Sequence, residues 1–266
     1  MVGAGGAVSV PTFVADDPFT APGTVTLGED AAHHMRVRRL ETGVRVGLVD
    51  GVGTRGEGVL TQLAKRHAIV SVESAERVPA PSPVHLLVPV ADRDRMLWLA
   101  EKATELALSS WRPVLYRRSR NVSPRGEGTT FQQRVRARMA GALEQSRGAW
   151  IPMAFPEASL EHAIAGRPPG IALVLDQGAR PLMDALNPLM APARAGHPLP
   201  PITIAVGPEG GFESSELAAL EAAGFARVSL GVNILRFETA ALAGLAAVRA
   251  MLELADAEGI RVGDDL

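Results

Sequence analysis

The spacing of apolar residues changes at residues 79–83, and this change limits the chain to two differently built domains. Before it, short alternating apolar runs separated by Gly-rich turns predict antiparallel strands. After it, apolar strands alternate with helical segments, which indicates an α/β domain with a parallel sheet. The segment between them reads Pro-Ala-Pro-Ser-Pro, which is stiff and extended. We therefore predict a small β-barrel over residues 1–80 and an α/β domain over residues 81–266.

The same periodicities predict the elements of each domain. In the barrel we expect a hairpin turn over 50–53, a helix over 29–40, and strands over 24–27, 45–49, 58–60 and 67–72. In the α/β domain we expect strands over 84–90, 111–116, 171–175, 202–206 and 227–230. Its helices are expected over 92–107, 131–145, 214–223 (with serine caps at its start) and 239–254. The Pro-rich stretch over 178–201 is expected to be a loop.

Composition excludes several kinds of site. The chain has no cysteine, which excludes disulfides and thiolate metal ligands and fits a reducing cytosol. No stretch of about 20 uninterrupted apolar residues occurs, so no membrane span is expected. The first ten residues lack the basic and apolar regions of a signal peptide. We expect a cytoplasmic protein.

Arginine is concentrated in the middle of the chain. Residues 109–150 contain nine arginines against two glutamates, although the net charge of the chain is −2. A basic surface is typical of proteins that bind nucleic-acid phosphates. Arginines on helices are about as often a solvated face, so the charge pattern alone leaves both interpretations open.

A glycine-rich loop follows the strand predicted over 202–206. It reads Gly207-Pro-Glu-Gly-Gly211, and a helix follows it. Ligands bind beyond the carboxyl ends of parallel strands, and glycines let the backbone approach a ligand closely. The spacing matches neither common phosphate-binding motif, and no lysine is available for a γ-phosphate. A tight turn is the alternative for this loop taken alone.

A second loop, one helix later, favours a binding pocket. Residues 229–240 end a strand, turn at Gly231 and lead through an apolar Ile-Leu pair to Arg236. Two loops from the ends of neighbouring strands would form one pocket with apolar walls, which suits a flat adenine and a sulfonium better than a triphosphate. Arg236 follows an apolar run and is expected to be drawn inward, whereas Glu238 fits an exposed helix start.

Together the two loops resemble a known family. Val206-Gly-Pro-Glu-Gly-Gly-Phe212 and Leu230-Gly-(two residues)-Ile-Leu-Arg-(one residue)-Glu-Thr-Ala240 are similar to motifs of the 16S ribosomal RNA uracil-N3 methyltransferases, a family of the SPOUT superfamily. The resemblance covers nearly the whole chain in the right order. Its other motifs are the segment over 33–43, Glu101-Lys-Ala-Thr-Glu-Leu106, Arg118-Ser119, and Glu144-Gln-Ser-Arg147 with Ile151-Pro152.

The resemblance implies a fold, a cofactor and an assembly. It implies a PUA-like RNA-binding barrel followed by a SPOUT domain, whose C-terminal trefoil knot holds S-adenosyl-L-methionine (AdoMet). It also implies a homodimer with active sites at the interface, and no metal. The residues it assigns to the AdoMet pocket are Leu175, Asp176, Gly207, Pro208, Glu209, Gly210, Gly211, Leu230, Gly231, Ile234, Leu235 and Arg236.

Three residues depart from the family's pattern. Ala107 replaces a glycine, Gly148 stands where an arginine is common, and Phe237 replaces a threonine. The change at 148 removes an RNA contact, for which Arg147 is the candidate substitute. Phe237 lies inside the second motif and puts details of the pocket wall in doubt.

The expected reaction is methyl transfer to N3 of a uridine in 16S ribosomal RNA of the small subunit. Uracil N3 carries a proton, so the protein must stabilise a uracilate-like charge and orient N3. We assign Arg236 to that charge; the AdoMet carboxylate and an RNA phosphate are its rival partners. Glu209 or Glu238 is a candidate acceptor of the proton if it is buried.

Contacts to RNA are expected from basic side chains of both domains. The candidates are Arg36, Arg38, Arg39, Arg118, Arg120, Arg134, Arg138 and Arg147. His33, His34 and His85 lack the spacing of a metal site and are expected to be structural or to contact RNA. Two alternatives stay open: a SPOUT methyltransferase with a different base or ribose target, and a non-catalytic RNA-binding relative.

Overall fold

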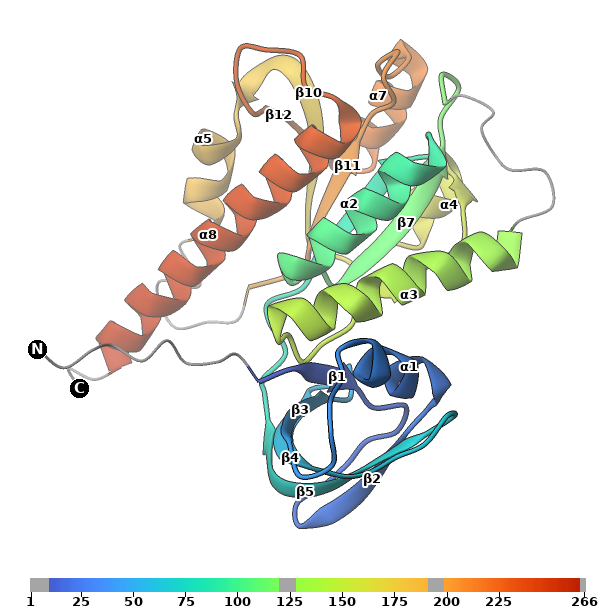
Figure 1. Cartoon of the computed structure of the whole chain (residues 1–266). Helices are drawn as coiled ribbons and strands as arrows, with labels where there is room; N and C mark the ends of the chain where they lie inside the picture. The colour runs from blue at the N-terminus through green and yellow to red at the C-terminus, as the bar shows by residue number, and fades with distance from the viewer. Residues whose placement is uncertain (1–9, 120–127, 191–198, 264–266) are drawn as a thin grey trace, which may run out of the picture. The chain divides into compact units, whose positions relative to one another are not determined.

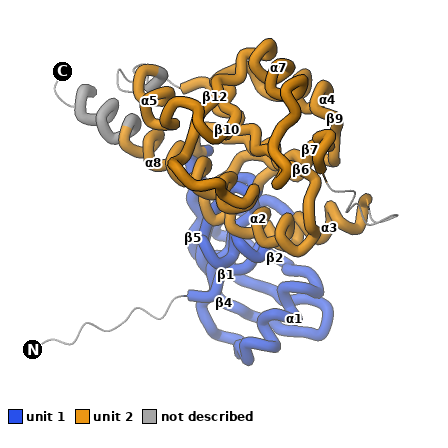
Figure 2. Tube along the Cα trace, turned by 90° about the horizontal axis from the view of Figure 1, so that it is seen from above, with its two compact units in different colours: residues 1–80, 140–151 blue, residues 81–139, 152–266 orange. Residues whose placement is uncertain are grey.

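The computed structural model describes residues 10–119, 128–190 and 199–263, without the side chains of 189–190 and 255–263. The chain divides into two compact units, residues 1–80 with 140–151 and residues 81–139 with 152–266 (Figure 2). One division falls inside a single helix, α3 (Gly128–Ser146). No pattern in the sequence predicts that residues 140–151 group with the first unit.

The first unit is a curved five-stranded sheet with one helix packed on it (Figure 1). Only the pairing of β1 with β3 is parallel among its described pairings, and the others are antiparallel. The helix, α1 (Glu29–Val37), ends three residues before the predicted position. In order across the sheet the strands are β1 (Thr12–Val14), β3 (Arg45–Val49), β4 (Thr54–Leu63), β5 (Ala68–Arg77) and β2 (Gly23–Leu27).

The predicted hairpin turn is confirmed. Strands β3 and β4 are antiparallel around residues 50–53. The Asp50 carboxylate accepts the N–H groups of Val52 at 2.9 Å and Thr54 at 2.8 Å. Because this side chain satisfies two backbone donors, it fixes the turn locally.

The segment over 140–151 completes the first unit through polar contacts. Glu144 Oε1 accepts the N–H of Val14 at 3.2 Å, and Trp150 Nε1 donates to the carbonyl of Val78 at 3.1 Å. The Arg77 guanidinium lies 5.0 Å from the centre of a Trp150 ring, within cation–π range. These contacts explain why a segment far along the chain belongs with the first eighty residues.

The second unit contains a parallel sheet, as predicted. Every pairing described in it is parallel, and all five residues of its central strand β11 are buried. Short β9 (Ala158–Ser159) also pairs with β7. The strand order is β12 (Ala226–Ser229), β10 (Ile171–Pro181), β11 (Ile202–Val206), β6 (Val84–Pro89), β7 (Ser110–Leu115) and β8 (Met153–Ala154).

Helices cover both faces of this sheet (Figure 1). On one face α2 (Arg93–Glu105) and α8 (Phe237–Gly263) contact each other, and α8 also packs on β11 and β6. On the other face α4 (Leu160–Ala165) and α7 (Ser214–Ala222) share a buried core with residues of β6, β7, β10 and β11. None of the described helices is long and apolar enough to cross a membrane.

Two local predictions in this unit are wrong. The expected loop over 178–201 contains structure, because β10 runs on to Pro181 and is followed by α5 (Leu182–Leu186) and a 3₁₀ turn, η1 (Asn187–Met190). Leu182 and Leu186 are buried, which anchors that helix despite the nearby prolines. Serines do not cap α7; instead Glu213 precedes it, and its N–H donates to the Glu216 carboxylate at 2.8 Å.

We expect Ala107→Gly to stabilise the protein by about 0.5–1 kcal/mol, because Ala107 has φ +55, a backbone conformation that favours glycine. The residue follows the C-terminus of α2, where glycine is the usual choice. Urea unfolding measures the change. Ala218→Gly, an exposed position inside α7, serves as the control and should cost about 1 kcal/mol. Equal destabilisation by both changes would refute the strain at Ala107.

We expect the stability of the protein to fall as pH drops from about 7.5 to 5, partly through His85. Burial, and secondarily Arg249, lowers the pKa of His85 in β6, where its Nδ1 lies 2.7 Å from Ser110 Oγ. A histidine whose pKa is lowered on folding is neutral in the native state, so protonation below its ordinary pKa of about 6.5 favours unfolding. Urea unfolding at several pH values should show a shallower decline for His85→Gln. Exposed His33→Gln should keep the wild-type slope; an unchanged slope in His85→Gln contradicts the assignment.

Candidate functional site

A cavity of about 360 Å³ opens at the carboxyl ends of β11 and β12, beside the middle of β10. Its walls come from residues 175–177, 206–212 and most of 228–235, together with Phe237 and Ala240. The structure brings the predicted pocket residues together here, with Arg236 as the exception. The two loops do not follow neighbouring strands, however, because β10 lies between β11 and β12 and supplies Leu175 and Asp176. Strand order cannot be read from the sequence, which is why that expectation was wrong.

Glycine is required at particular points of the cavity wall. A Cβ on Gly207 would lie 2.8 Å from the Phe212 ring, so the loop can take this path only without a side chain there. Gly211 and Gly231 have φ values of +73 and +149, which other residues rarely adopt. The glycines therefore leave bare backbone lining the cavity.

Polar contacts fix the ends of the strands around the cavity. Arg227 Nε donates to Asp176 Oδ2 at 2.8 Å, and its Nη2 bonds the same oxygen, which links β12 to β10. Gln177 Nε2 donates to the carbonyl of Val232 at 3.2 Å. The loop over 230–236 is thus attached to the middle of β10.

Arg95, in the first turn of α2, joins the loop over 207–211 to the start of α8 and was missed by the sequence reasoning. Its Nε and Nη2 donate to the two oxygens of Glu238 at 3.0 and 2.5 Å, and its Nη1 donates to Glu209 at 2.5 Å. The guanidinium also lies 4.7 Å from the centre of the Phe237 ring. These bonds to carboxylates, that to Glu238 first, raise the pKa of Arg95. In the sequence Arg95 is one of two arginines at a helix start, and nothing separates it from Arg93.

The contacts of Arg95 distinguish the two candidate proton acceptors, Glu209 and Glu238. Glu238 is bonded through both oxygens, its side chain is only 13% exposed, and it does not line the cavity. The expectation of an exposed Glu238 at a helix start is wrong. Glu209 lines the cavity and its side chain is 39% exposed. Of the two, Glu209 is better placed to meet a ligand.

Arg236 is exposed, so the expectation that it is drawn inward is wrong. It does not line the cavity, and its guanidinium has no hydrogen bond or ion pair with any residue described. The physical reason lies in the preceding apolar residues, because Val232 is 90% exposed and Ile234 is 81% exposed. A run that is itself on the surface does not pull the next side chain inward.

The departures at 148 and 237 have local explanations. Phe237 is 2% exposed, lines the cavity and packs under the Arg95 guanidinium, so it supports the Arg95 contact rather than disturbing the wall. A Cβ on Gly148 would lie 3.0 Å from Leu143 Cδ1, closer than a side chain is usually accommodated. The arginine beside it, Arg147, has φ +56.

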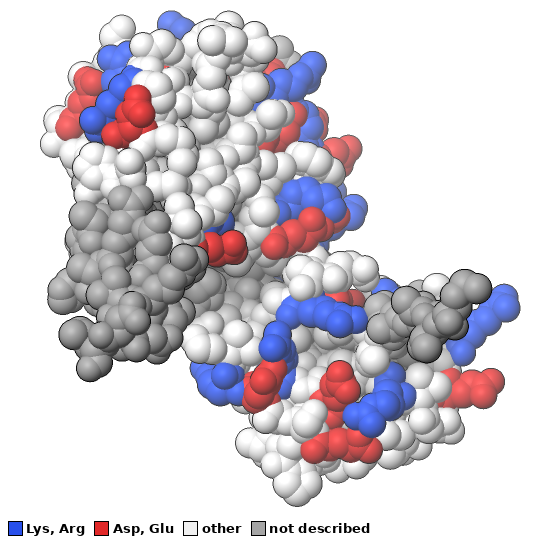
Figure 3. Space-filling view, turned by 90° about the vertical axis from the view of Figure 1, so that its left-hand side faces the viewer, with Lys and Arg blue, Asp and Glu red and all other residues white. Residues whose placement is uncertain are grey.

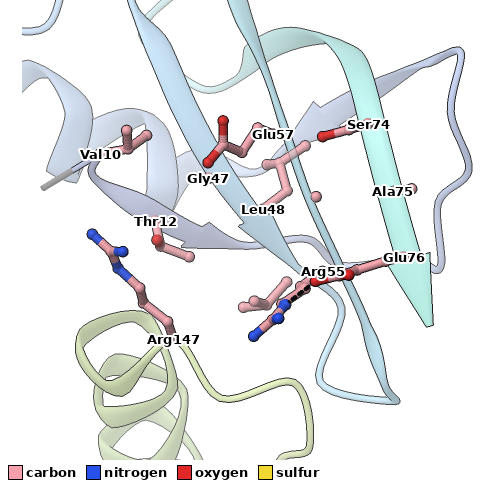
Figure 4. A pocket seen from close by; sticks show the side chains of 12 residues that line it. Val10, Thr12, Gly47, Leu48, Arg55, Glu57, Ser74, Ala75, Glu76 and Arg147 are labelled. Atoms are coloured by element: carbon pink, nitrogen blue, oxygen red, sulfur yellow. Dashed lines mark hydrogen bonds and ion pairs between the residues drawn. The ribbon is translucent and has the colours of Figure 1, made fainter. Parts of the chain in front are cut away.

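The predicted RNA-contacting arginines are divided between the units. Arg36, Arg38, Arg39 and Arg147 belong to the first unit, and Arg118, Arg134 and Arg138 to the second; Arg120 lies outside the described residues. Arg147 lines a cavity of about 500 Å³ in the first unit, together with Thr12 and Arg55 (Figure 4). Arg138 is paired with Glu101 at 3.3 Å. On the face in Figure 3, basic and acidic side chains are interspersed rather than segregated.

Histidines do not assemble a metal site in the described part of the chain. No group of three or more His, Asp or Glu side chains is arranged to hold a metal there. His33 and His34 are exposed on α1, with ring centres 6.2 Å apart.

Comparison with known proteins identifies the class. The family described as the RNA methyltransferase domain matches residues 78–249, and the RNA methyltransferase PUA domain matches residues 27–73. The first match covers more than half of the chain, so the chain belongs to the RNA methyltransferase family. The family predicted from the two loop motifs is confirmed, as is the combination of a PUA-like domain with a parallel-sheet methyltransferase domain.

Individual relatives carry one shared name. A protein of Synechocystis sp. called ribosomal RNA small subunit methyltransferase E is 31% identical over 86% of this chain and 74% of its own length. A protein of the same name from Mycobacterium bovis is 29% identical over 90% and 91%. The crystal structure of the protein of that name from Neisseria gonorrhoeae, bound to S-adenosyl methionine, has a TM-score of 0.80 at 27% identity, covering 91% of this chain and 98% of that one.

Proposed function

We propose that this protein transfers a methyl group from AdoMet to N3 of a uridine in 16S ribosomal RNA. The observation that carries the proposal is the cavity at the ends of β11 and β12, beside β10, where the family's two motifs meet. The names of the Synechocystis and Mycobacterium relatives support the small-subunit substrate. The Neisseria structure, bound to S-adenosyl methionine, supports the cofactor. A ribosomal substrate also supports a cytoplasmic location.

The residues around the cavity fit AdoMet. Its volume of about 360 Å³ lies in the range of about 300–1,000 Å³ typical of small-molecule sites. Leu230, Ile234 and Leu235 offer apolar walls for an adenine. A side chain at position 207 would run into the Phe212 ring, so the backbone of Gly207 stays bare. Asp176 and Glu209 supply carboxylates for the cationic part of the ligand. The C-terminal trefoil knot expected of the SPOUT superfamily is part of this proposal.

When bound, AdoMet supplies an activated methyl group and needs no metal. The chain's own residues must orient the uracil, stabilise the charge left by the N3 proton and receive that proton. We assign the charge to Arg236, whose guanidinium is uncommitted among the residues described. We assign the proton to Glu209, because it lines the cavity and Glu238 does not.

A homodimer belongs to the proposal because an apolar surface lies beside the cavity. Val232, Ile234, Leu235 and Met183 are exposed, and large exposed apolar patches mark contact sites. Figure 3 shows a broad uncharged region on the corresponding side of the second unit, where α5, β10 and α8 lie in Figure 1. A second copy covering this surface would place a partner beside Arg236. Light scattering after gel filtration measures the assembly.

The test of the function is methyl transfer to small ribosomal subunits that lack the modification. Tritiated AdoMet is the donor, and mass spectrometry identifies the labelled nucleoside. Label in N3-methyluridine supports the proposal. Label in another base or a ribose supports a SPOUT enzyme with a different target, and AdoMet binding without transfer supports a non-catalytic RNA-binding protein.

A further inference from the structure

A second cavity, of about 420 Å³, adjoins the AdoMet site. Its walls are residues 90–92 and Arg95 at the start of α2, Arg118 after β7, and the loop residues Pro208–Gly210. Those three loop residues also line the first cavity, so one loop separates the two. The second cavity is therefore a described space from which a second substrate could reach the methyl donor across the loop over 208–210.

Arg118 holds the separating loop and keeps donors for a ligand. Its Nη1 donates to the carbonyl of Gly210 at 2.7 Å, and its side chain lies across Gly210, where a Cβ would be 3.3 Å away. Its Nε lies 3.9 Å from Glu213 Oε1, which leaves Nη2 without a described partner, and the side chain is 51% exposed. A guanidinium has five N–H donors in a planar fork, so Arg118 can bind Gly210 and an acceptor in the cavity together.

Arg95 does not offer the same capacity. All three of its nitrogens donate to Glu238 or Glu209. It forms a fixed wall of the cavity held by two carboxylates, and Arg118 keeps more N–H donors for a new acceptor.

The lining selects a base rather than a bare phosphate. Asp92 and Glu209 place two carboxylates beside the arginines, which disfavours a doubly charged anion. Val90, Ala91 and Pro208 provide apolar surface against which a planar ring can lie. The N3 edge of uracil presents an oxygen, an N–H and a second oxygen, which complements one guanidinium and one carboxylate.

We infer that this cavity receives the acceptor uracil, with Arg118 donating to an oxygen adjacent to N3 and Glu209 facing the N3–H. This inference rests on the proposed function. The N3 proton passes to the Glu209 carboxylate, and its bonding electrons stay on the ring, shared by N3 and both exocyclic oxygens. Arg118 stabilises the charge on one of these oxygens. A uridine in folded RNA must be turned out of its stack to enter.

The test compares Arg118→Gln with Arg117→Gln, using tritiated AdoMet and unmodified small subunits. Arg117 is the matched control, because it is 71% exposed, pairs with Glu213 at 3.6 Å and does not line the cavity. Arg118→Gln should lower kcat by about 10²-fold, the usual cost of losing one donor to a developing oxyanion. AdoMet binding by calorimetry should change by less than about threefold. Arg118→Lys, which keeps the charge, should recover part of the rate.

A pH profile separates this role from a structural one. Without the Arg118 cation the N3 proton is harder to remove. The kcat of Arg118→Gln should therefore keep rising up to a higher pH than the kcat of the wild type does. Near wild-type kcat in Arg118→Gln, an equal loss in Arg117→Gln, or a loss that follows weakened AdoMet binding overturns the inference. If wild-type protein binds AdoMet but makes no N3-methyluridine, the proposed function fails instead.

Discussion

Replacing Arg95 with methionine is expected to weaken AdoMet binding by about tenfold or more and to lower the free energy of unfolding by about 2–4 kcal/mol. Methionine keeps the length of the side chain but leaves the largely buried Glu238 carboxylate without its donor. It also releases Glu209, so the loop over 207–211 and the start of α8 are no longer held together. Calorimetry with AdoMet and urea unfolding measure the two effects.

Two further variants make that result specific. Arg45→Met removes an arginine that also bridges two glutamates, at 3.3 and 3.0 Å, but on the exposed surface of the first unit. It should cost at most about 1 kcal/mol and leave AdoMet binding unchanged. Adding Glu238→Gln to Arg95→Met should restore part of the lost stability, because a neutral amide then replaces the largely buried Glu238 carboxylate. Wild-type AdoMet affinity in Arg95→Met would show that the loop over 207–211 and the start of α8 hold their positions independently.

Arg236→Ala is expected to lower methylation by about 10²-fold while leaving the free energy of unfolding within about 0.5 kcal/mol of wild type. The guanidinium is exposed and makes no bond with the described residues, so its loss removes no internal contact. A fall in kcat at unchanged AdoMet affinity supports the stabilisation of charge on uracil. Transfer assays on small subunits, with calorimetry for AdoMet, provide both readouts.

The rival roles of Arg236 have their own signatures. If it binds the AdoMet carboxylate, the dissociation constant for AdoMet rises. If it binds an RNA phosphate, RNA affinity falls and its dependence on salt becomes shallower by about one phosphate contact. Methylation close to the wild-type rate in Arg236→Ala would remove this residue from the mechanism.

The sequence predicts the local features of the site better than its assembly. The motifs around Gly207 and Gly231 are predictable because the need for glycine is local. A turn whose backbone leaves no room for a side chain requires glycine in any fold. The position of β10 between β11 and β12 follows from strand pairing over long separations, which no local pattern records. Arg95 is invisible for the same reason, since its partners Glu209 and Glu238 lie more than a hundred residues further along the chain.

Burial was also predicted wrongly from the sequence, at two places. An apolar run usually faces a core, and this expectation placed Arg236 inward. In the structure Val232 and Ile234 are exposed, so apolar character here marks a surface available to a partner rather than an interior. The prediction of a loop over 178–201 was wrong in the opposite direction, because residues expected on the surface are buried. Leu182 and Leu186 are buried although prolines lie nearby in the sequence.

The discontinuous first unit has a consequence for how the chain is made. The ribosome releases residues 1–80 well before residues 140–151. Until then the N–H of Val14 lacks its acceptor Glu144, and the carbonyl of Val78 lacks its donor Trp150. Domains usually fold as units during synthesis, N-terminal domain first. Here the first unit cannot complete its folding until α3 has left the ribosome. Its final packing is therefore delayed until part of the second unit has been translated.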